Sequence, residues 1–236
     1  MVDYSNIELT VFDKLESTNT YLLKKQEEGG LVSGAAVQAL KQSAGRGRYD
    51  RKWEDAGGNM ALSIYLEPDI ATQHLSQIAF VTAIAVVKTI LAQGVPPESI
   101  RLKWPNDVLL EGKKCCGILI ERAGDKGLVV GTGINVAAAP ADKACISHHV
   151  STNLEDVVSA YLTSFKALYV AWQELGFEHI VEQWMAYAWR LEEEIEVKLR
   201  HQQFKGVFKR LDKDGALIVK RSDTQEIQRI TAGEIF

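Results

Sequence analysis

Cysteine is scarce in this chain, and its three cysteines are poorly placed for a disulfide or a zinc site. Cys115 and Cys116 are adjacent and Cys145 is the third, so the odd count gives a poor disulfide framework. Their spacing matches no common zinc pattern. No histidine pattern accompanies them, which favours core packing over nucleophilic chemistry. Reduced thiols of this kind indicate a cytoplasmic setting.

Long hydrophobic runs are also missing. Residues 1–8 are polar and lack the apolar core of a signal peptide. The longest apolar stretch, residues 78–92, is broken by Thr82, Lys88 and Thr89, which favours a buried helix over a membrane span. We therefore expect no membrane partner.

Basic residues are not in excess. The formal net charge is −4, from 27 Lys and Arg against 31 Asp and Glu, so general attraction to nucleic acid is not expected. Basic residues are nevertheless crowded into one short stretch, which predicts a discrete anion site. They are Lys41, Arg46, Arg48, Arg51 and Lys52.

The pattern of apolar residues predicts an α+β fold. With 236 residues, 46% of them hydrophobic and 25% charged, the chain suits one large globular domain or one domain with a small appendage. Helices are predicted over residues 17–28, 75–92, 154–175 and 178–190. Strands are predicted over residues 7–15, 35–41, 59–66, 100–104, 108–110, 115–121 and 128–136, with a loop over residues 137–150.

From Glu194 onwards the pattern is purely β. Short strands are predicted over residues 195–200, 204–211, 216–219 and 227–230, with a hairpin turn at Asp214-Gly215. They form a unit of roughly 45 residues, small enough for an SH3-like barrel. We expect a domain boundary near Leu191, which gives domains of residues 1–190 and 191–236.

Five polar clusters interrupt this framework, mostly at the ends of elements, where functional sites are usually built. Residues 16–19, Glu-Ser-Thr-Asn, suit a helix cap, and their hydroxyls and amide also suit a small polar ligand. Residues 42–53 combine Gln42 with a Gly-Arg-Gly-Arg run. Glycines let backbone amides approach a ligand, and arginine forks match phosphate or carboxylate oxygens. A solvated basic loop or an RNA contact would have the same composition, and the order of a Walker A loop is missing.

The other three clusters are shorter. Residues 103–107, Lys-Trp-Pro-Asn-Asp, form either a simple turn or a polar corner between two strands. Lys114 opens an apolar strand, where its amine points into a cleft or lies at the surface. Residues 131–136, Gly-Thr-Gly-Ile-Asn-Val, put two glycines in a buried strand, which implies close approach by backbone or ligand. The third glycine and following helix of a dinucleotide fingerprint are missing.

Each cluster is weak alone, but their order and spacing resemble the biotin–protein ligase family. The motifs are Ser-Thr-Asn at 17–19, Gly-Arg-Gly-Arg-x-x-Arg-x-Trp at 45–53, Lys-Trp-Pro-Asn-Asp at 103–107, Lys-x-x-Gly-Ile-Leu at 114–119 and Gly-x-Gly-Ile-Asn-Val at 131–136. The β-rich tail resembles the family's small C-terminal domain. The resemblance implies an α+β catalytic domain of the class II synthetase and biotin–lipoyl ligase type, with a mixed β-sheet flanked by helices, followed by an SH3-like β-barrel.

The resemblance also implies a two-step reaction. The biotin carboxylate attacks the α-phosphate of ATP, with Mg²⁺, to give biotinyl-adenylate and pyrophosphate. A lysine of a carrier protein then attacks the activated carbonyl and releases AMP, and the expected carrier is the biotin carboxyl carrier domain of acetyl-CoA carboxylase. Two anions can be brought together only if cationic donors offset their repulsion. A closed loop would protect the mixed anhydride from water.

Roles for individual residues follow from the same resemblance. The expected catalytic residues are Lys114, Arg46, Arg48 and Asp107, with Lys114 bridging the carboxylate and the α-phosphate. The expected biotin-binding residues are Ser17, Thr18, Asn19, Gln42, Gly45, Arg46, Lys114, Gly117 and Gly131. The expected ATP- or adenylate-binding residues are Arg48, Trp53, Asn106, Lys114 and Asn135. Mg²⁺ enters mainly with ATP, and Asp107 either helps to hold it or orients the acceptor lysine.

Two features depart from the family pattern. Some members carry an N-terminal helix-turn-helix domain and repress transcription, whereas this chain starts almost directly at the catalytic strand, so we expect a monofunctional enzyme that binds no nucleic acid. Residues 137–150 take the place of the family's second adenylate-covering loop but contain no tryptophan.

Three alternatives stay open: lipoate or octanoate attachment, a biotin sensor without turnover, and RNA binding. Either a monomer or a homodimer fits the sequence.

Overall fold

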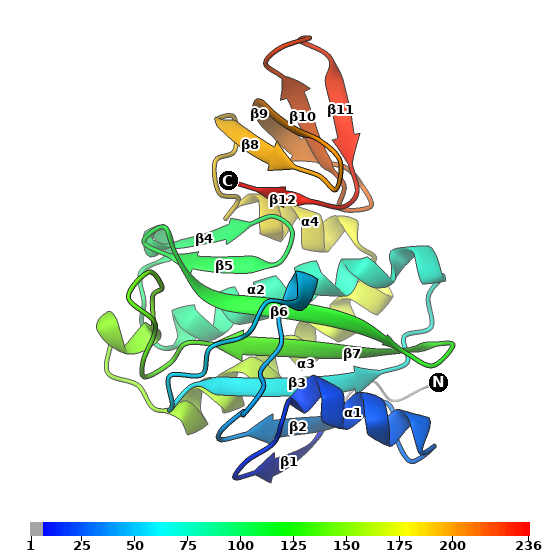
Figure 1. Ribbon diagram of the computed structural model, residues 1–236, viewed down its shortest axis with the longest axis vertical. Helices are drawn as coiled ribbons and strands as arrows, with labels where there is room; N and C mark the ends of the chain where they lie inside the picture. The colour runs from blue at the N-terminus through cyan, green and yellow to red at the C-terminus, as the bar shows by residue number, and fades with distance from the viewer. Residues whose placement is uncertain (1–6) are drawn as a thin grey trace.

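A seven-stranded mixed sheet lies at the centre of the computed structural model, which describes residues 7–236 (Figure 1). Its strand order is β1-β2-β3-β7-β6-β5-β4, with β1 and β2 parallel and the other neighbours antiparallel. The strands are β1 (Glu8–Phe12), β2 (Ala35–Ala39), β3 (Met60–Leu66), β4 (Ile100–Lys103), β5 (Asp107–Leu110), β6 (Lys113–Ala123) and β7 (Gly127–Ile134). Most of the polar N-terminus expected over residues 1–8 lies outside the described residues.

Helices cover the two faces of this sheet unequally. α1 (Thr18–Glu27) packs on one face, and α2 (Ile78–Ala92), α3 (Leu154–Leu175) and α4 (Glu178–Met185) lie on the other side (Figure 1). In β3, the large apolar side chains predicted to share one face join the α2–α3 core, and Tyr65 on the opposite face packs with Leu22 of α1. β3 is therefore buried on both faces, and the shorter covering on the α1 side leaves room for a cavity.

α2 is the apolar helix that the sequence predicts to be buried. The helical stretch Gln73–Ala92 is long and apolar enough to cross a membrane, but 78% of its apolar window is buried inside the protein. Thr82 and Thr89 do not interrupt it, because their hydroxyls donate to the Ile78 and Ala85 carbonyls one turn earlier, each at 2.7 Å. The prediction of a buried helix is confirmed.

The helix predicted over residues 178–190 is wrong at its C-terminus, because α4 ends at Met185. The residues after it instead line the edge of the central sheet. The Leu102 N–H donates to the Tyr187 carbonyl at 2.7 Å, and the Trp189 N–H donates to the Leu102 carbonyl at 2.9 Å. These bonds cover β4, which would otherwise be an open edge strand. Such long-range pairing leaves no trace in a helical periodicity.

The C-terminal residues form a second, five-stranded antiparallel sheet in the order β11-β10-β9-β8-β12. Its strands are β8 (Glu194–Lys198), β9 (Gln203–Leu211), β10 (Leu217–Arg221), β11 (Ile227–Ile230) and β12 (Glu234–Ile235). The predicted turn at Asp214-Gly215 is present, with Gly215 at φ +89°. The predicted α+β fold with a small β-rich C-terminal unit is confirmed. β12 is too short for a sequence pattern, and it pairs with β8.

All three cysteines are free and buried, as their spacing predicts. Burial raises the pKa of the Cys115 thiol and of the Cys116 thiol well above the ordinary value. A thiol that stays neutral is a poor nucleophile. The two therefore act as packing residues of the core.

Leu22 anchors α1 to the sheet through a fully buried side chain. Leu22→Ala would leave a cavity beneath the helix that carries Ser17 to Asn19, and we expect it to lower the free energy of unfolding by about 2–5 kcal/mol. Urea unfolding followed by circular dichroism measures this loss. Leu175→Ala is the matched control, because Leu175 is 66% exposed at the end of α3. Equal losses in the two variants would contradict the packing described for α1.

Candidate functional site

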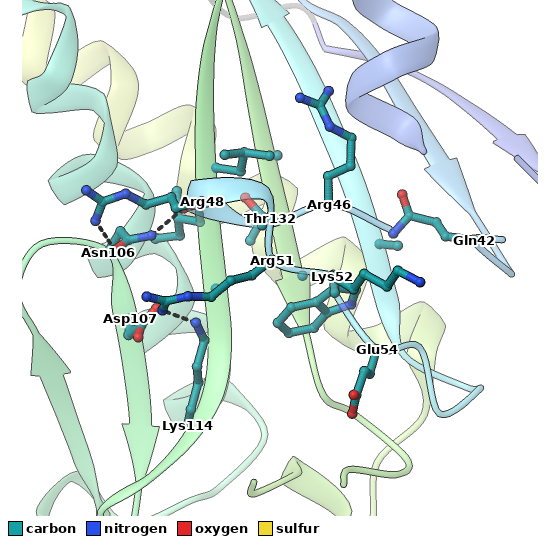
Figure 2. A pocket seen from close by; sticks show the side chains of 18 of the residues that line it. Gln42, Arg46, Arg48, Arg51, Lys52, Glu54, Asn106, Asp107, Lys114 and Thr132 are labelled. Atoms are coloured by element: carbon teal, nitrogen blue, oxygen red, sulfur yellow. Dashed lines mark hydrogen bonds and ion pairs between the residues drawn. The ribbon is translucent and has the colours of Figure 1, made fainter. Parts of the chain in front are cut away.

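A cavity of about 370 Å³ opens on the α1 face of the central sheet (Figure 2). That volume suits a small-molecule ligand. Small residues lie side by side on three strands of its floor: Ala61 of β3 pairs with Gly133 of β7, and Gly133 pairs with Gly117 of β6. Without side chains there, a ligand or a neighbouring residue can approach the backbone closely.

Gly131 and Gly133 make the close contacts that two glycines in a buried strand predict. A Cβ on Gly131 would lie 2.1 Å from Asn19 Oδ1, and a Cβ on Gly133 would lie 2.6 Å from the Trp53 indole. Both distances are far below a van der Waals contact. The two glycines therefore allow Asn19 and Trp53 to form the wall of the cavity.

The N-terminus of α1 contributes a cluster of polar groups. The Ser17 hydroxyl caps the helix by accepting a backbone N–H of the first turn. The Thr18 N–H donates to Gln42 Oε1 at 2.8 Å. Ser63 Oγ of β3 lies 2.7 Å from Thr18 Oγ1 and 2.6 Å from Asn19 Oδ1. The motif thus serves both as the expected helix cap and as a polar lining of the cavity.

The basic stretch at residues 45–53 folds back on itself as a narrow hairpin, which we name the arginine hairpin. The Gly47 N–H donates to the Arg51 carbonyl at 2.7 Å, and the Trp53 N–H donates to the Gly45 carbonyl at 3.0 Å. A Cβ on Gly45 would lie 2.7 Å from the Trp53 carbonyl oxygen, so the two sides of the hairpin need a glycine there. Tyr49 turns the tip with φ +56°.

Three arginines tie the arginine hairpin to three separate parts of the chain. The pairs are Arg46 with Glu121 of β6 at 2.8 Å, Arg48 with Asn106 at 2.8 Å and Arg51 with Glu234 of β12 at 2.7 Å. Figure 2 shows Arg46 pointing away from the other two arginines: Arg48 lies beside Asn106, and Arg51 lies near Asp107 and Lys114. The hairpin therefore joins the central sheet to the C-terminal sheet.

Lys114 and Asp107 form an ion pair at the cavity. Lys114 Nζ lies 2.6 Å from Asp107 Oδ1 (Figure 2). Strict alternation along β6 would put Lys114 and Gly117 on opposite faces of the sheet, because they are three residues apart. The register between β5 and β6 shifts by one residue at Cys115, and this bulge brings Lys114 to the cavity side.

The Lys-Trp-Pro-Asn-Asp corner faces two ways. Asn106–Asp107 line the cavity. Lys103 points to the C-terminal sheet, where its Nζ lies 4.8 Å from the ring centre of Phe236, and burial lowers the pKa of Lys103. The Trp104 indole N–H donates to the Gly215 carbonyl at 3.1 Å. The polar corner between two strands is therefore present, and it also holds the C-terminal unit.

Basic side chains outnumber acidic ones around the cavity, by six to four. The basic residues are Arg46, Arg48, Arg51, Lys52, Lys114 and Lys143, and the acidic residues are Glu54, Asp107, Asp142 and Glu234. Guanidinium and ammonium groups match phosphate and carboxylate oxygens. Such a site can bring two anions together and stabilise the charge that develops when they react.

Asn135 and Trp53 bring unpaired polar atoms to the cavity wall. Asn135 is 2% exposed, and its Nδ2 donates to the Ala144 carbonyl at 3.0 Å. Within residues 7–236, the buried atoms Asn135 Oδ1 and Trp53 Nε1 have no hydrogen-bond partner. Buried polar atoms are normally paired. Both residues line the cavity, so a bound ligand is a candidate partner for these atoms.

Known protein families account for both parts of the chain. The Biotin/lipoate A/B protein ligase family matches residues 11–137, and the Biotin protein ligase C terminal domain matches residues 191–236. The chain belongs to the biotin/lipoate A/B protein ligase family.

Individual relatives of this ligase family are similar over most of the chain. A biotin–[acetyl-CoA-carboxylase] ligase of Paracoccus denitrificans is 33% identical, covering 94% of this chain and 98% of its own length. The bifunctional ligase/repressor BirA of Bacillus subtilis (strain 168) is 31% identical, covering 86% of this chain and 66% of its own length. A solved structure, the biotin protein ligase from Aquifex aeolicus in complex with biotin and ATP, has a TM-score of 0.84 and 26% identity, covering 97% of each chain.

The site residues named from the ligase-family motifs almost all line this one cavity. They are Ser17, Thr18, Asn19, Gln42, Arg46, Arg48, Trp53, Asn106, Asp107, Lys114, Gly117, Gly131 and Asn135. Gly45 is buried within the arginine hairpin behind them. The structure brings these residues together, and their individual roles stay predictions.

Charged residues without a predicted site role also line the cavity, and Arg51, Lys143 and Glu234 are among them. Arg51 belongs to the motif at residues 45–53 but has no predicted role of its own, and its partner Glu234 lies 183 residues away. Lys143 comes from the 137–150 loop, which has little periodicity and contains a short helical turn at Ile146–His148. Contacts over such separations leave no local signal in one sequence.

The close packing of Trp53 on Gly133 of the cavity floor can be tested by adding one methyl group. Gly133→Ala would put a Cβ 2.6 Å from Trp53, so we expect the indole to move, tryptophan fluorescence to change, and stability to fall by about 1–3 kcal/mol. Thermal unfolding and emission spectra measure both effects. Gly30→Ala is the control, because nothing lies within 4 Å of a Cβ there. Unchanged fluorescence in Gly133→Ala would rule out the packing of Trp53 on the floor.

Proposed function

We propose that this chain is a biotin–protein ligase that uses ATP to activate biotin and transfers the biotinyl group to one lysine of a carrier protein. The observation that carries the proposal is a single cavity in which Lys114 meets the arginine hairpin above a floor of small residues. The reaction joins a carboxylate to a nucleotide phosphate, so it needs a site of this charge and size. Membership of the ligase family and the names of the relatives support the same chemistry.

The proposed biotin subsite is the N-terminus of α1 together with the small residues of the cavity floor. Biotin has a compact, largely apolar ring system that carries a ureido group with both donors and an acceptor. Hydroxyl and amide groups of Thr18 and Gln42 suit that group, and the floor leaves space for the rings. The proposed biotin-binding residues are Ser17, Thr18, Asn19, Gln42, Gly45, Arg46, Lys114, Gly117 and Gly131.

The proposed nucleotide subsite contains Asn135 and Trp53. The Asn135 Nδ2 group donates a hydrogen bond to the Ala144 carbonyl, and Asn135 Oδ1 has no partner among residues 7–236. Asn135 Oδ1 is therefore the proposed acceptor for the adenine amino group. Trp53 supplies an aromatic face for the base or for the rim of the cavity. The proposed ATP- or adenylate-binding residues are Arg48, Trp53, Asn106, Lys114 and Asn135, and Arg51 adds a cation beside them.

Lys114 is the proposed centre of the chemistry, with Arg46 and Arg48 as further catalytic residues. A biotin carboxylate oxygen attacks the α-phosphorus, the bond from that phosphorus to the leaving oxygen breaks, and pyrophosphate departs. The Lys114 ammonium offsets the repulsion of the two anions and stabilises the transition state, while the arginines hold phosphate oxygens. A neutral carrier amine then attacks the carbonyl carbon, loses a proton and forms the amide as AMP leaves.

Mg²⁺ is proposed to accompany ATP rather than to occupy a dedicated protein site. Within the described residues, no group of three or more His, Cys, Asp or Glu side chains could hold a metal. Mg²⁺ commonly binds substrate phosphates with one or two carboxylates, and Asp107 fits that role. The ion would neutralise phosphate charge. Asp107 also suits the alternative role of orienting the acceptor lysine, because it already contacts an ammonium group, that of Lys114.

The proposed domains are residues 1–190, catalytic, and residues 191–236, C-terminal. The second family match begins at residue 191, which supports this boundary. The proposed carrier is the biotin carboxyl carrier domain of acetyl-CoA carboxylase, in accord with the name of the Paracoccus relative. The proposed compartment is the cytoplasm, in accord with three free buried thiols.

Transfer to a carrier domain tests the proposal directly. With ATP and Mg²⁺, we expect biotin to add its mass to one lysine of a biotin carboxyl carrier domain, as read by mass spectrometry, and lipoate or octanoate to give no product. Octanoate transfer without biotin transfer would instead assign the sister activity. Tight biotin binding without turnover would indicate a sensor. Either result, with folded protein, contradicts the ligase.

Lys114→Ala tests the residue that carries most of the proposed chemistry. We expect biotin-dependent pyrophosphate release to fall by roughly 10²-fold or more, because the two anions lose a shared cation, while circular dichroism stays unchanged. Lys113→Ala is the matched control, since Lys113 precedes Lys114 on β6 and is exposed. Near-normal pyrophosphate release in Lys114→Ala would remove this lysine from the mechanism.

A further inference from the structure

Glu121 of β6 binds two side chains that come from widely separated segments. One carboxylate oxygen lies 2.8 Å from Arg46 Nη2, and the other lies 3.3 Å from Arg46 Nη1 and 2.9 Å from Asn19 Nδ2. A paired, charge-assisted contact of this kind has a defined geometry. The Glu121 side chain is 20% exposed and that of Arg46 is 44% exposed, so water screens the contact in part.

The bond to Glu121 is the shorter of two donor bonds that orient the Asn19 amide. Asn19 is 3% exposed, and its Oδ1 lies 2.6 Å from Ser63 Oγ. Its Nδ2 donates to the carboxylate of Glu121 at 2.9 Å and to the Leu119 carbonyl at 3.4 Å. Asn19 also fills the space above Gly131, where a Cβ would lie 2.1 Å from its Oδ1. The amide is therefore held from both ends against the cavity floor.

The bond to Arg46 holds the arginine hairpin at its base. The backbone of Arg46 forms an antiparallel β-bridge with that of Lys52 across the arginine hairpin. This bridge lies next to the hydrogen bond between Gly45 and Trp53. Trp53 in turn lies on Gly133 of the floor. A movement of Arg46 would thus change the position of the segment that carries Arg48 and Trp53.

We propose that Glu121 is a positioning residue that links the N-terminus of α1 to the arginine hairpin and holds both in the geometry that binds biotin. It acts through Asn19 and Arg46 and does not itself line the cavity. The inference rests on the proposed function, because it assigns the linked segments to biotin binding. The ordering of the arginine hairpin and the binding of biotin then both depend on the carboxylate of Glu121.

Two substitutions separate the two contacts of Glu121. Glu121→Ala removes both, and Glu121→Gln keeps an oxygen acceptor for Asn19 but loses the charged pair with Arg46. We expect Glu121→Ala to weaken biotin binding roughly tenfold or more, as measured by calorimetry without ATP, and Glu121→Gln to give an intermediate loss. Trypsin should cut after Arg46, Arg48 or Arg51 faster in Glu121→Ala than in the wild type, with Glu121→Gln again intermediate.

Glu28→Gln is the matched control, because it removes a carboxylate from an ion pair with Lys25 at the far end of α1. It should change neither biotin binding nor cleavage, and all three variants should unfold at similar temperatures. Wild-type binding and digestion in both Glu121 variants would overturn the link. A wild type that binds no biotin would overturn the proposed function instead, and digestion without ligand would then still decide whether Glu121 orders the hairpin.

Discussion

Charge pairs hold the cavity together, and two of the three join distant segments of the chain. Lys114 pairs with Asp107 at 2.6 Å, Arg46 with Glu121 at 2.8 Å, and Arg51 with Glu234 at 2.7 Å. Cations crowded into one cavity would repel each other at this range, and the interleaved carboxylates offset that repulsion. Anionic substrates must therefore compete with carboxylates already in place. These ion pairs must break before the cavity can open, so they contribute to the free energy that opening costs.

Backbone geometry decides which side chains reach this cavity. Gly131 and Gly133 leave space for Asn19 and Trp53, and the bulge at Cys115 turns Lys114 to the same face. Each feature is local, yet each acts on residues far away in the chain. The C-terminal sheet belongs to the same assembly, because Glu234 reaches the arginine hairpin and Gly215 accepts a hydrogen bond from the Trp104 indole.

Local patterns predicted the parts of the molecule that local physics determines. The periodicity of residues 154–175 matches the bounds of α3, and Ser17 begins α1 as its capping chemistry predicts. Nearly all the site residues named by resemblance to a family line this one cavity. Single-sequence patterns could not reveal the Arg51–Glu234 and Arg46–Glu121 pairs, which join residues 183 and 75 positions apart. The predicted C-terminal end of α4 was wrong for the same reason, because the residues after α4 form hydrogen bonds with β4.

The proposed function depends on one step, in which this cavity joins biotin to the α-phosphate of ATP. Exchange of labelled pyrophosphate into ATP tests that step alone, because it needs reversible adenylate formation and no carrier protein. We predict exchange that requires biotin and Mg²⁺ and is lost when biotin is replaced by lipoate or octanoate. Folded protein that gives no exchange, or exchange that does not depend on biotin, would contradict the account.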